Sequence, residues 1–261
     1  MKENNKRRTI IRKALSSINH VKPWRQAFQK RVSTTAEWFQ REPAFQQWKA
    51  LKGNAVLWLW GTMGTGKTVL VSNIIAHIHT HRQPHDTISY FFCHNGLSLS
   101  ARSILGSLVC QILDSQIQNA EGEELLGLDQ LDEDSSASEV TKFLLVHLKP
   151  NMTCFLVIDG LDECDAGVVR EVARNIDQLR QYTSGTFKVL YAGRPELDQL
   201  LFKQIAPDFK IPVSGNKIQS DIEIYISQTL GQCLDEEKLE LGDPSLVIEI
   251  SKCLRTGSSG M

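Results

Sequence analysis

The stretch "VLWLWGTMGTGKTVLVSNII", residues 56–75, joins an apolar run, a glycine-rich turn and a second apolar run. Its centre fits the pattern G-x-x-x-x-G-K-[ST], whose glycines let backbone N–H groups turn inward onto an anion. In such a loop Lys67 reaches the β- and γ-phosphates of a nucleotide and the Thr68 hydroxyl ligates Mg²⁺. The loop follows a strand-length run and precedes one with helical spacing, which is the context that the motif requires. The predicted nucleotide contacts are Gly61, Thr62, Met63, Gly64, Thr65, Gly66, Lys67, Thr68 and Val69.

Beyond Leu51, strand-like runs alternate with helical ones. The strand-like runs are apolar throughout, which is typical of parallel strands covered on both faces by helices. Crossover connections then place the carboxyl ends of the strands, and the ligand site, along one edge. We therefore predict an α/β fold, a P-loop NTPase three-layer sandwich with a mainly parallel sheet of about five strands. The predicted strands are 56–60, 87–93, 153–159, 187–193 and 209–213, and the predicted helices are 69–79, 101–113 and roughly 168–181.

Carboxylates follow the third predicted strand, in "CFLVIDGLDECD". Asp159 closes the apolar run, where a charge is costly unless it faces a cation, so we expect it to hold Mg²⁺. Asp162 and Glu163 lie just beyond, and either could orient or deprotonate an attacking water. Many ATPases with a helical lid carry glutamate directly after the metal-binding aspartate, but here Gly160 stands there. The alternative for both later acids is an acidic helix start, which the helix dipole favours.

The fourth predicted strand ends in "YAGRPELDQL", which places Arg194 at a strand tip on the nucleotide edge. A guanidinium at this position could sense the γ-phosphate. The alternative is a solvated arginine before the turn-forming Pro195. We take Asp162, Glu163 and Arg194 as the candidate catalytic residues.

The segment Asn216-Lys217-Ile218-Gln219 tests the identity of the base. Guanine-binding GTPases commonly use N-K-x-D after a late strand, where the aspartate accepts hydrogen bonds from two guanine nitrogens. Here glutamine is fourth, and one amide carbonyl cannot replace a bidentate carboxylate. The segment therefore favours ATP over GTP as the bound nucleotide, without excluding GTP.

Two other patterns could suggest a metal or a reactive thiol. His77 and His81 are one helical turn apart, but the stretch ends a helix before Pro84 and has no nearby cysteine. A solvated helix terminus is therefore favoured over a zinc site. Cys164 has no apparent histidine partner in the sequence, so packing is favoured over thiol chemistry.

The composition is that of an ordinary globular protein, with 41% hydrophobic and 23% charged residues and a formal net charge of −1. Nothing in this balance indicates a nucleic-acid partner. No apolar run reaches the roughly 18–20 residues of a membrane span, and the six cysteines show no C-x-x-C spacing. We expect a cytoplasmic protein. The basic start, residues 2–13, is predicted to be solvated or disordered, and the acidic stretch 121–139 to be a mobile insertion.

Helical segments flank the predicted sheet on both sides. Residues 14–52 read as helical, with "TTAE" as a capping box that has Thr34 as N-cap and Glu37 reaching back. Pro43 then opens the next helix. The helical signal returns after Asn216 and stops near the end of the chain. The predicted domains are a basic and then helical segment (1–50), a nucleotide-binding domain (51–215) and the truncated start of a helical lid (216–261).

Taken together, these residues resemble the NACHT-type nucleotide-binding domains of signal-transduction (STAND) P-loop NTPases, including fungal NACHT proteins and the N-terminal region of nephrocystin-3. The resemblance spans roughly residues 33–260, and its segments occur in the expected order. It is carried by "TTAEWFQREPAFQQWKA", "WLWGTMGTGKTVL", "YFFC", "FLVIDGLDECD", "VLYAGRP" and "DIEIYI".

The resemblance implies a switch that binds ATP or GTP, hydrolyses it weakly and oligomerises when a partner domain senses a stimulus. It also implies that a small residue at Gly160 is ordinary, and that "TTAEW" packs near the base of the nucleotide. Such proteins usually continue into a winged-helix domain and then into repeats, which this chain does not contain.

Three functions are therefore compared. The first is a signalling module whose nucleotide state controls self-association or the binding of protein partners. The second is a P-loop phosphotransferase or ATPase. Such an enzyme needs a closing lid with arginines, whereas residues 100–150 contain a single arginine, Arg102. The third is a degenerate interaction module without nucleotide, which the intact Lys67, Thr68 and Asp159 disfavour.

Overall fold

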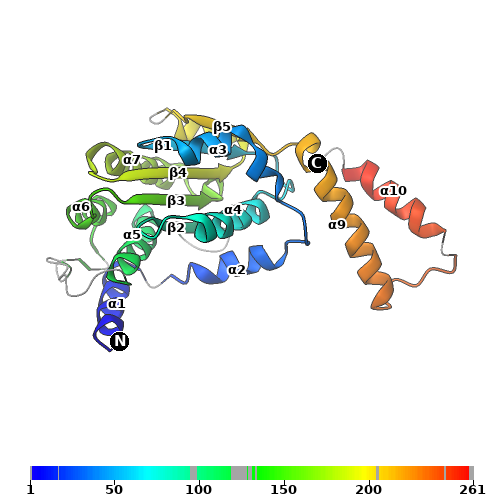
Figure 1. The fold of residues 1–261 in the computed structure, drawn as a ribbon, viewed down its shortest axis with the longest axis horizontal. Coiled ribbons are helices and arrows are strands. Elements are labelled where there is room, and N and C mark those ends of the chain that lie inside the picture. Colours follow the sequence, from blue (N-terminus) through cyan, green and yellow to red (C-terminus); the bar gives the residue numbers. More distant parts are fainter. Residues whose placement is uncertain are drawn as a thin grey trace.

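A five-stranded sheet with the strand order β2–β3–β4–β1–β5 forms the centre of the protein, and all its strand pairs are parallel (Figure 1). The computed structural model describes residues 2–16, 18–94, 99–118, 128, 131–132, 134–203, 206–243 and 245–258. The strands are β1 (Ala55–Trp60), β2 (Thr87–Phe92), β3 (Thr153–Asp159), β4 (Thr186–Gly193) and β5 (Phe209–Pro212). The predicted fold class and the five strands are confirmed.

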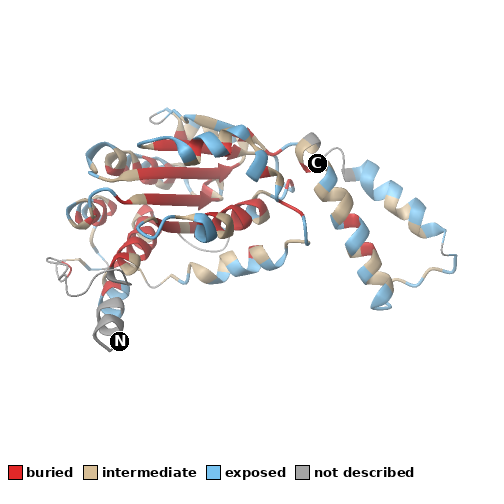
Figure 2. Cartoon of the chain, in the orientation of Figure 1, coloured by how far each residue is buried: buried red, intermediate tan, exposed pale blue. Residues whose placement is uncertain are grey.

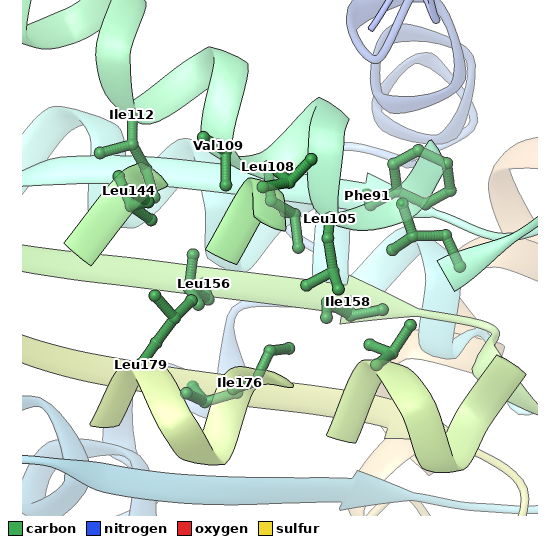
Figure 3. Close-up of a cluster of buried hydrophobic side chains, with 14 of the residues drawn as sticks. Phe91, Leu105, Leu108, Val109, Ile112, Leu144, Leu156, Ile158, Ile176 and Leu179 are labelled. Carbon is green, nitrogen blue, oxygen red and sulfur yellow. The ribbon is translucent and has the colours of Figure 1, made fainter. Parts of the chain in front are cut away.

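Helices cover both faces of the sheet because the strands β1 to β4 bury side chains on both sides. In β3, Leu156 and Ile158 belong to one buried cluster, and Phe155 and Val157 belong to the other. Figure 3 shows the first cluster, between the sheet and α5, α6 and α7. The first face is covered by α1 (Lys2–Leu15), α5 (Ala101–Gln118), α6 (Ala137–His147), α7 (Ala166–Tyr182) and α8 (Asp198–Leu201). The second face is covered by α2 (Val21–Gln29), α3 (Pro43–Ala50) and α4 (Lys67–His81), and Pro43 opens α3 as predicted.

The basic start of the chain differs from the expected solvated or disordered segment, because it forms α1. Ile11 and Leu15, one helical turn apart, are buried in the first cluster together with residues of α5. Arg102 of α5 donates hydrogen bonds to the carbonyls of Ala14 (2.7 Å) and Leu15 (2.6 Å) at the end of α1. A cation at the carboxyl end of a helix is favourable. Arg102 therefore anchors α1.

The capping box predicted in "TTAE" is wrong. Thr34 and Ala36 adopt positive φ angles of 66° and 54°, so this segment is a loop, and the following element is the 3₁₀ helix η1 (Trp38–Arg41). The N–H of Ala36 donates to Asp221 Oδ2 at 2.7 Å, and its carbonyl accepts a hydrogen bond from the side chain of Asn73. Partners from distant helices therefore hold the backbone where a local cap was expected.

The helix α6 was not predicted, because the acidic stretch 121–139 hides its start. Residues 121–127, 129–130 and 133 of that stretch lie outside the described residues. Its end is not a loop: Ser136 Oγ accepts from the Glu139 N–H at 3.2 Å, and Glu139 Oε2 accepts from the Ser136 N–H at 2.6 Å. This reciprocal pair is a capping box that opens α6. The sequence "SASE" carried the signal within the acidic run.

The chain ends in a pair of helices, α9 (Gly215–Asp235) and α10 (Leu246–Ser258), which stand away from the sandwich (Figure 1). Their surfaces are mainly intermediate or exposed, whereas the central strands β3 and β4 are mainly buried (Figure 2). Two short 3₁₀ helices, η3 (Leu161–Glu163) and η4 (Pro195–Leu197), follow β3 and β4. In the described part of the chain, we find no helix with the length and apolar character that crossing a membrane requires.

Candidate functional site

The parallel register brings the chemistry-bearing residues to one edge of the sheet. Trp60, at the end of β1, pairs with Gly193 of β4, and Asp159, at the end of β3, pairs with Ala192. The glycine-rich loop, the aspartate and Arg194 therefore leave the sheet side by side. This is the shared edge that the sequence predicts, and it follows from the crossover connections of parallel strands.

The loop after β1 has the backbone shape of an anion cradle. Gly64 and Gly66 have φ angles of 84° and 77°, in the region that glycine adopts without strain. Gly66 is also the N-cap of α4, whose first amides lack partners within the helix and face the loop with the positive end of the dipole. The Thr65 hydroxyl donates to the Thr62 carbonyl at 2.9 Å and closes the turn. These features fit a phosphate group.

The side chain of Lys67 lies inside this loop. Its ammonium donates to the carbonyls of Gly61 at 2.8 Å and Thr62 at 2.7 Å. Burial lowers the pKa of Lys67, and the charges of Asp159 and Asp162 act in the opposite direction. A phosphate oxygen is a stronger acceptor than a peptide carbonyl because it is charged, so it can draw the ammonium toward the ligand.

Asp159 is a buried carboxylate, 4% exposed, at the carboxyl end of β3. Burial raises the pKa of Asp159 to about 7, while a hydrogen bond from the Thr68 hydroxyl and the charge of Lys67 act to lower it. The described residues contain no cluster of three His, Cys, Asp or Glu side chains that could hold a metal. The Thr68 hydroxyl and the Asp159 carboxylate lie in contact, and both are hard oxygen ligands. This pair fits Mg²⁺, which usually takes one or two protein ligands together with phosphate oxygens.

Only glycine fits at position 160, directly after Asp159. Gly160 has a φ angle of 77°, and a Cβ atom there would lie 2.6 Å from the carbonyl oxygen of Cys93. Because that oxygen belongs to the backbone, it cannot easily move away. A glutamate in the place that many ATPases use for their catalytic base is therefore excluded on steric grounds.

Asp162 faces Arg194. Its Oδ2 lies 3.1 Å from Arg194 Nε, and its Oδ1 accepts from the backbone N–H of Arg194 at 3.4 Å. The Asp162 side chain is 12% exposed, whereas that of Arg194 is 42% exposed. This contact makes Asp162 a support that orients Arg194. The other predicted acid, Glu163, is exposed in η3 at the same edge.

A cavity of about 480 Å³ adjoins the loop. Its walls come from the segment before η1, from the loop and the start of α4, from α9 and from Leu254 of α10. Most of the lining side chains are apolar, among them Val32, Val69, Ile222 and Ile226. An apolar cavity beside a phosphate cradle has the shape and chemistry of a nucleoside pocket. Sequence reasoning missed the α9 and α10 walls, because helical spacing does not show what a helix covers.

In the segment interpreted as a near match to the guanine motif, Ile218 lines the cavity, whereas the side chains of Lys217 and Gln219 contact other protein groups. Lys217 Nζ lies 2.6 Å from Glu42 Oε2 and 5.5 Å from the centre of the Trp38 ring. Gln219 donates to Glu223 Oε1 at 3.3 Å. The Lys217 contacts join the start of α9 to the N-terminal segment, and the Gln219 hydrogen bond lies within α9.

His77 is partly buried and packed against aromatic rings, whereas His81 is exposed, in line with the predicted solvated helix end. The His77 ring centre lies 5.5 Å from that of Phe39 and 4.3 Å from that of His81. Burial lowers the pKa of His77 to about 4, so the ring is neutral near pH 7. Cys164 packs against the first core cluster, in line with the favoured interpretation.

Several solved structures share part of this fold. Cdc6p from Pyrobaculum aerophilum is 15% identical with a TM-score of 0.44, and the match covers 75% of this chain and 50% of that one. Drosophila ORC bound to DNA is 16% identical with a TM-score of 0.47, covering 76% and 49%. A Walker-type ATPase of Pyrococcus abyssi is 15% identical with a TM-score of 0.45, covering 82% and 62%. The chain thus spans about half the length of the first two.

No curated protein matches this sequence. Residues 34–194 match the family described as nephrocystin 3, N-terminal. The matched segment runs from the loop before η1, through the glycine-rich loop and Asp159, to Arg194, and it includes more than half of the chain. The protein therefore belongs to the nephrocystin 3 N-terminal family.

Proposed function

We propose that this protein is a nucleotide-binding switch of the NACHT-type STAND class, which binds ATP in preference to GTP and hydrolyses it slowly with Mg²⁺. One contrast carries this proposal. The residues that bind phosphate and Mg²⁺ in such sites are all present, whereas position 160 accepts only glycine and so cannot hold a catalytic glutamate. Lys67, Thr68 and Asp159 supply what binding requires, whereas Gly160 leaves no room for the usual base. Such a site holds a nucleotide better than it turns one over.

The roles within the site follow from these contacts. The ammonium of Lys67 binds the β- and γ-phosphates, and the loop amides surround them. Thr68 and Asp159 would hold Mg²⁺, which neutralises charge on the phosphate oxygens when bound. Asp162 orients Arg194 toward the γ-phosphate position, and Glu163 orients the attacking water. Slow hydrolysis fits this arrangement, because the exposed Glu163 does not stand in the place directly after Asp159 that many ATPases use for the base.

The cavity supports the regulatory part of the proposal. A nucleoside in it would contact the sandwich through Val69 and the C-terminal helices through Ile222 and Leu254. A bound ligand would therefore stabilise the docked position of α9 and α10 against the sandwich, because it contacts both parts only when they are docked. Exposed apolar side chains lie on both helices, including Tyr225 and Ile248, at 53% and 73% exposure. We propose that nucleotide state thereby controls self-association or the binding of a protein partner.

Calorimetry with ATP–Mg²⁺ and GTP–Mg²⁺, followed by steady-state turnover, tests the proposal. We expect binding of ATP and turnover well below ~1 s⁻¹, under the usual enzyme range. Turnover well above that value would favour the phosphotransferase or ATPase alternative. Failure of both nucleotides to bind would favour an interaction module. Identification of the nucleotide that co-purifies adds an independent test, because retained ADP is the expected state of a switch held off.

A further inference from the structure

We propose that Asp221 selects the base, by accepting a hydrogen bond from the 6-amino group of adenine in the cavity beside the phosphate loop. This inference rests on the proposed function, since it assigns the base-reading residue of the same site. The near match to the guanine motif, at the start of α9, has its described polar side chains, Lys217 and Gln219, bonded to Glu42 and Glu223. The carboxylate one helical turn after Lys217 is in position instead.

Asp221 is the one carboxylate among the described residues that line the cavity. The remaining walls are mostly apolar, and Lys30 is the other charged side chain that lines it. A ligand that fills this cavity therefore meets few polar groups. In such a pocket a single well-placed acceptor determines which polar edge of a base is accepted.

One oxygen of this carboxylate already has a partner. Oδ2 accepts from the backbone N–H of Ala36 at 2.7 Å, and the carbonyl of Ala36 is held by Asn73 of α4. Both contacts reach Ala36 from well-formed helices, so the carboxylate has a fixed orientation. Burial raises the pKa of Asp221, while the hydrogen bond from the Ala36 backbone acts to lower it. Oδ1 is the acceptor left for a ligand.

The chemistry of the two purines makes this arrangement selective. Adenine carries an amino donor at position 6, whereas guanine carries a carbonyl acceptor there. A carboxylate binds guanine best through both oxygens, one for N1–H and one for the 2-amino group. Because the N–H of Ala36 already donates to Oδ2, that oxygen has only one acceptor site left and a backbone neighbour beside it, which disfavours the bidentate contact. A guanine carbonyl facing Oδ1 would instead place two acceptors together, and an unpaired buried polar group is costly.

The substitution Asp221→Asn tests the inference by reversing the polarity offered to the base. The side-chain carbonyl of asparagine is its single acceptor, so it should keep the Ala36 bond and turn the amino group toward the base. We would measure, by calorimetry with Mg²⁺, the binding of ATP, GTP and purine riboside triphosphate, which lacks the 6-amino group. Asp235→Asn, an exposed change at the end of the same helix, is the matched control.

The wild-type protein should bind ATP at least about tenfold more tightly than purine riboside triphosphate, the usual effect of one hydrogen bond to a charged group. In Asp221→Asn this advantage should vanish and the ATP-to-GTP preference should fall at least about tenfold, with Asp235→Asn unchanged. Unchanged preferences in Asp221→Asn, or loss of all three ligands including purine riboside triphosphate, would overturn the inference. Failure of the wild type to bind any triphosphate would instead count against the proposed function.

Discussion

The two halves of the candidate site are built in opposite ways. The phosphate half is continuous in the chain: the loop runs from the end of β1 to the start of α4, and Lys67 bonds carbonyls only six and five residues away. The nucleoside half is assembled from segments far apart in the sequence, and the contact between Ala36 and Asp221 spans 185 residues. The first half depends on local backbone geometry, and the second depends on the docking of α9.

This difference suggests that the two halves respond differently to a bound ligand. A phosphate cradle held by a strand and a helix of the core should keep its shape whether or not a ligand is bound. A pocket whose far wall is a helix pair standing away from the sandwich should respond to the ligand (Figure 1). Inorganic triphosphate, which lacks a nucleoside, separates the two halves experimentally because it should occupy the first half alone.

The largest effect is expected from Lys67→Ala. Without its ammonium the cradle has lost the side chain that reaches the β- and γ-phosphates, so binding of ATP and of inorganic triphosphate should both fall by about a hundredfold or more. Thermal stabilisation by nucleotide should disappear with it. Differential scanning calorimetry with each ligand measures the effect. Retained stabilisation by ATP would mean that the nucleoside half dominates binding.

Asp159→Asn should remove most of the dependence of ATP binding on Mg²⁺, since a neutral amide is a poor ligand for a hard cation. It should also stabilise the free protein at pH 8. The folded pKa of Asp159 is raised from 3.8 to about 7, so ionisation destabilises the fold, with no effect below pH 4 and the full effect above pH 7.

The gain in unfolding free energy at pH 8 should be about 4 kcal/mol and should shrink as the pH falls from 7 to 4. Urea unfolding of both proteins across this range provides the measurement. A variant that is less stable than wild type at pH 8 would show that Asp159 is not held at a cost, and would weaken its assignment as a metal ligand.

Glu163→Gln should act on hydrolysis alone. If Glu163 orients the attacking water, the slow turnover of ATP should fall by about a hundredfold while the dissociation constant for ATP changes less than about twofold. Single-turnover hydrolysis and calorimetry on the same sample separate the two quantities. Full hydrolysis by this variant would rule out the proposed role, and Glu171→Gln, an exposed change in α7, is the control.

The smallest effect is expected from Ile222→Ala in the nucleoside half. Removal of part of an apolar wall should weaken ATP binding by about three- to tenfold, in line with the transfer free energy of a few methylene groups. Binding of inorganic triphosphate should be unchanged. Isothermal titration with both ligands makes the comparison. Equal losses for both would contradict the division of the site into two independent halves.

Patterns that are local in the sequence predicted the sheet and the phosphate half well. The five strands are apolar runs, and the glycine-rich loop combines a turn with the start of a helix, so period and spacing were sufficient. The same reasoning overlooked α6, although Ser136 and Glu139 form a capping box, because acidic composition was given more weight than the local motif. It also placed a capping box at Thr34, where the structure has a loop.

The wrong capping box at Thr34 and the failure to predict the α9 and α10 walls of the cavity have the same cause: both depend on contacts between distant residues. A threonine followed three residues later by glutamate favours a helix start by a small amount of free energy, of the order of 1 kcal/mol. The hydrogen bonds from Asn73 and Asp221 to the Ala36 backbone compete with that preference and prevail here. Neither partner can be identified from spacing, since they lie 37 and 185 residues away.

The sequence by itself determined the α/β sheet, the loop that cradles phosphate and the edge that collects Asp159, Asp162 and Arg194, because these depend on backbone preferences and on the regular geometry of parallel strands. Tertiary structure alone decided that Asp162 contacts Arg194, that the Cys93 carbonyl leaves no space for a side chain at position 160, and that α9 completes the cavity. Those features depend on which distant atoms meet, and a pattern of neighbours along the chain does not contain that information.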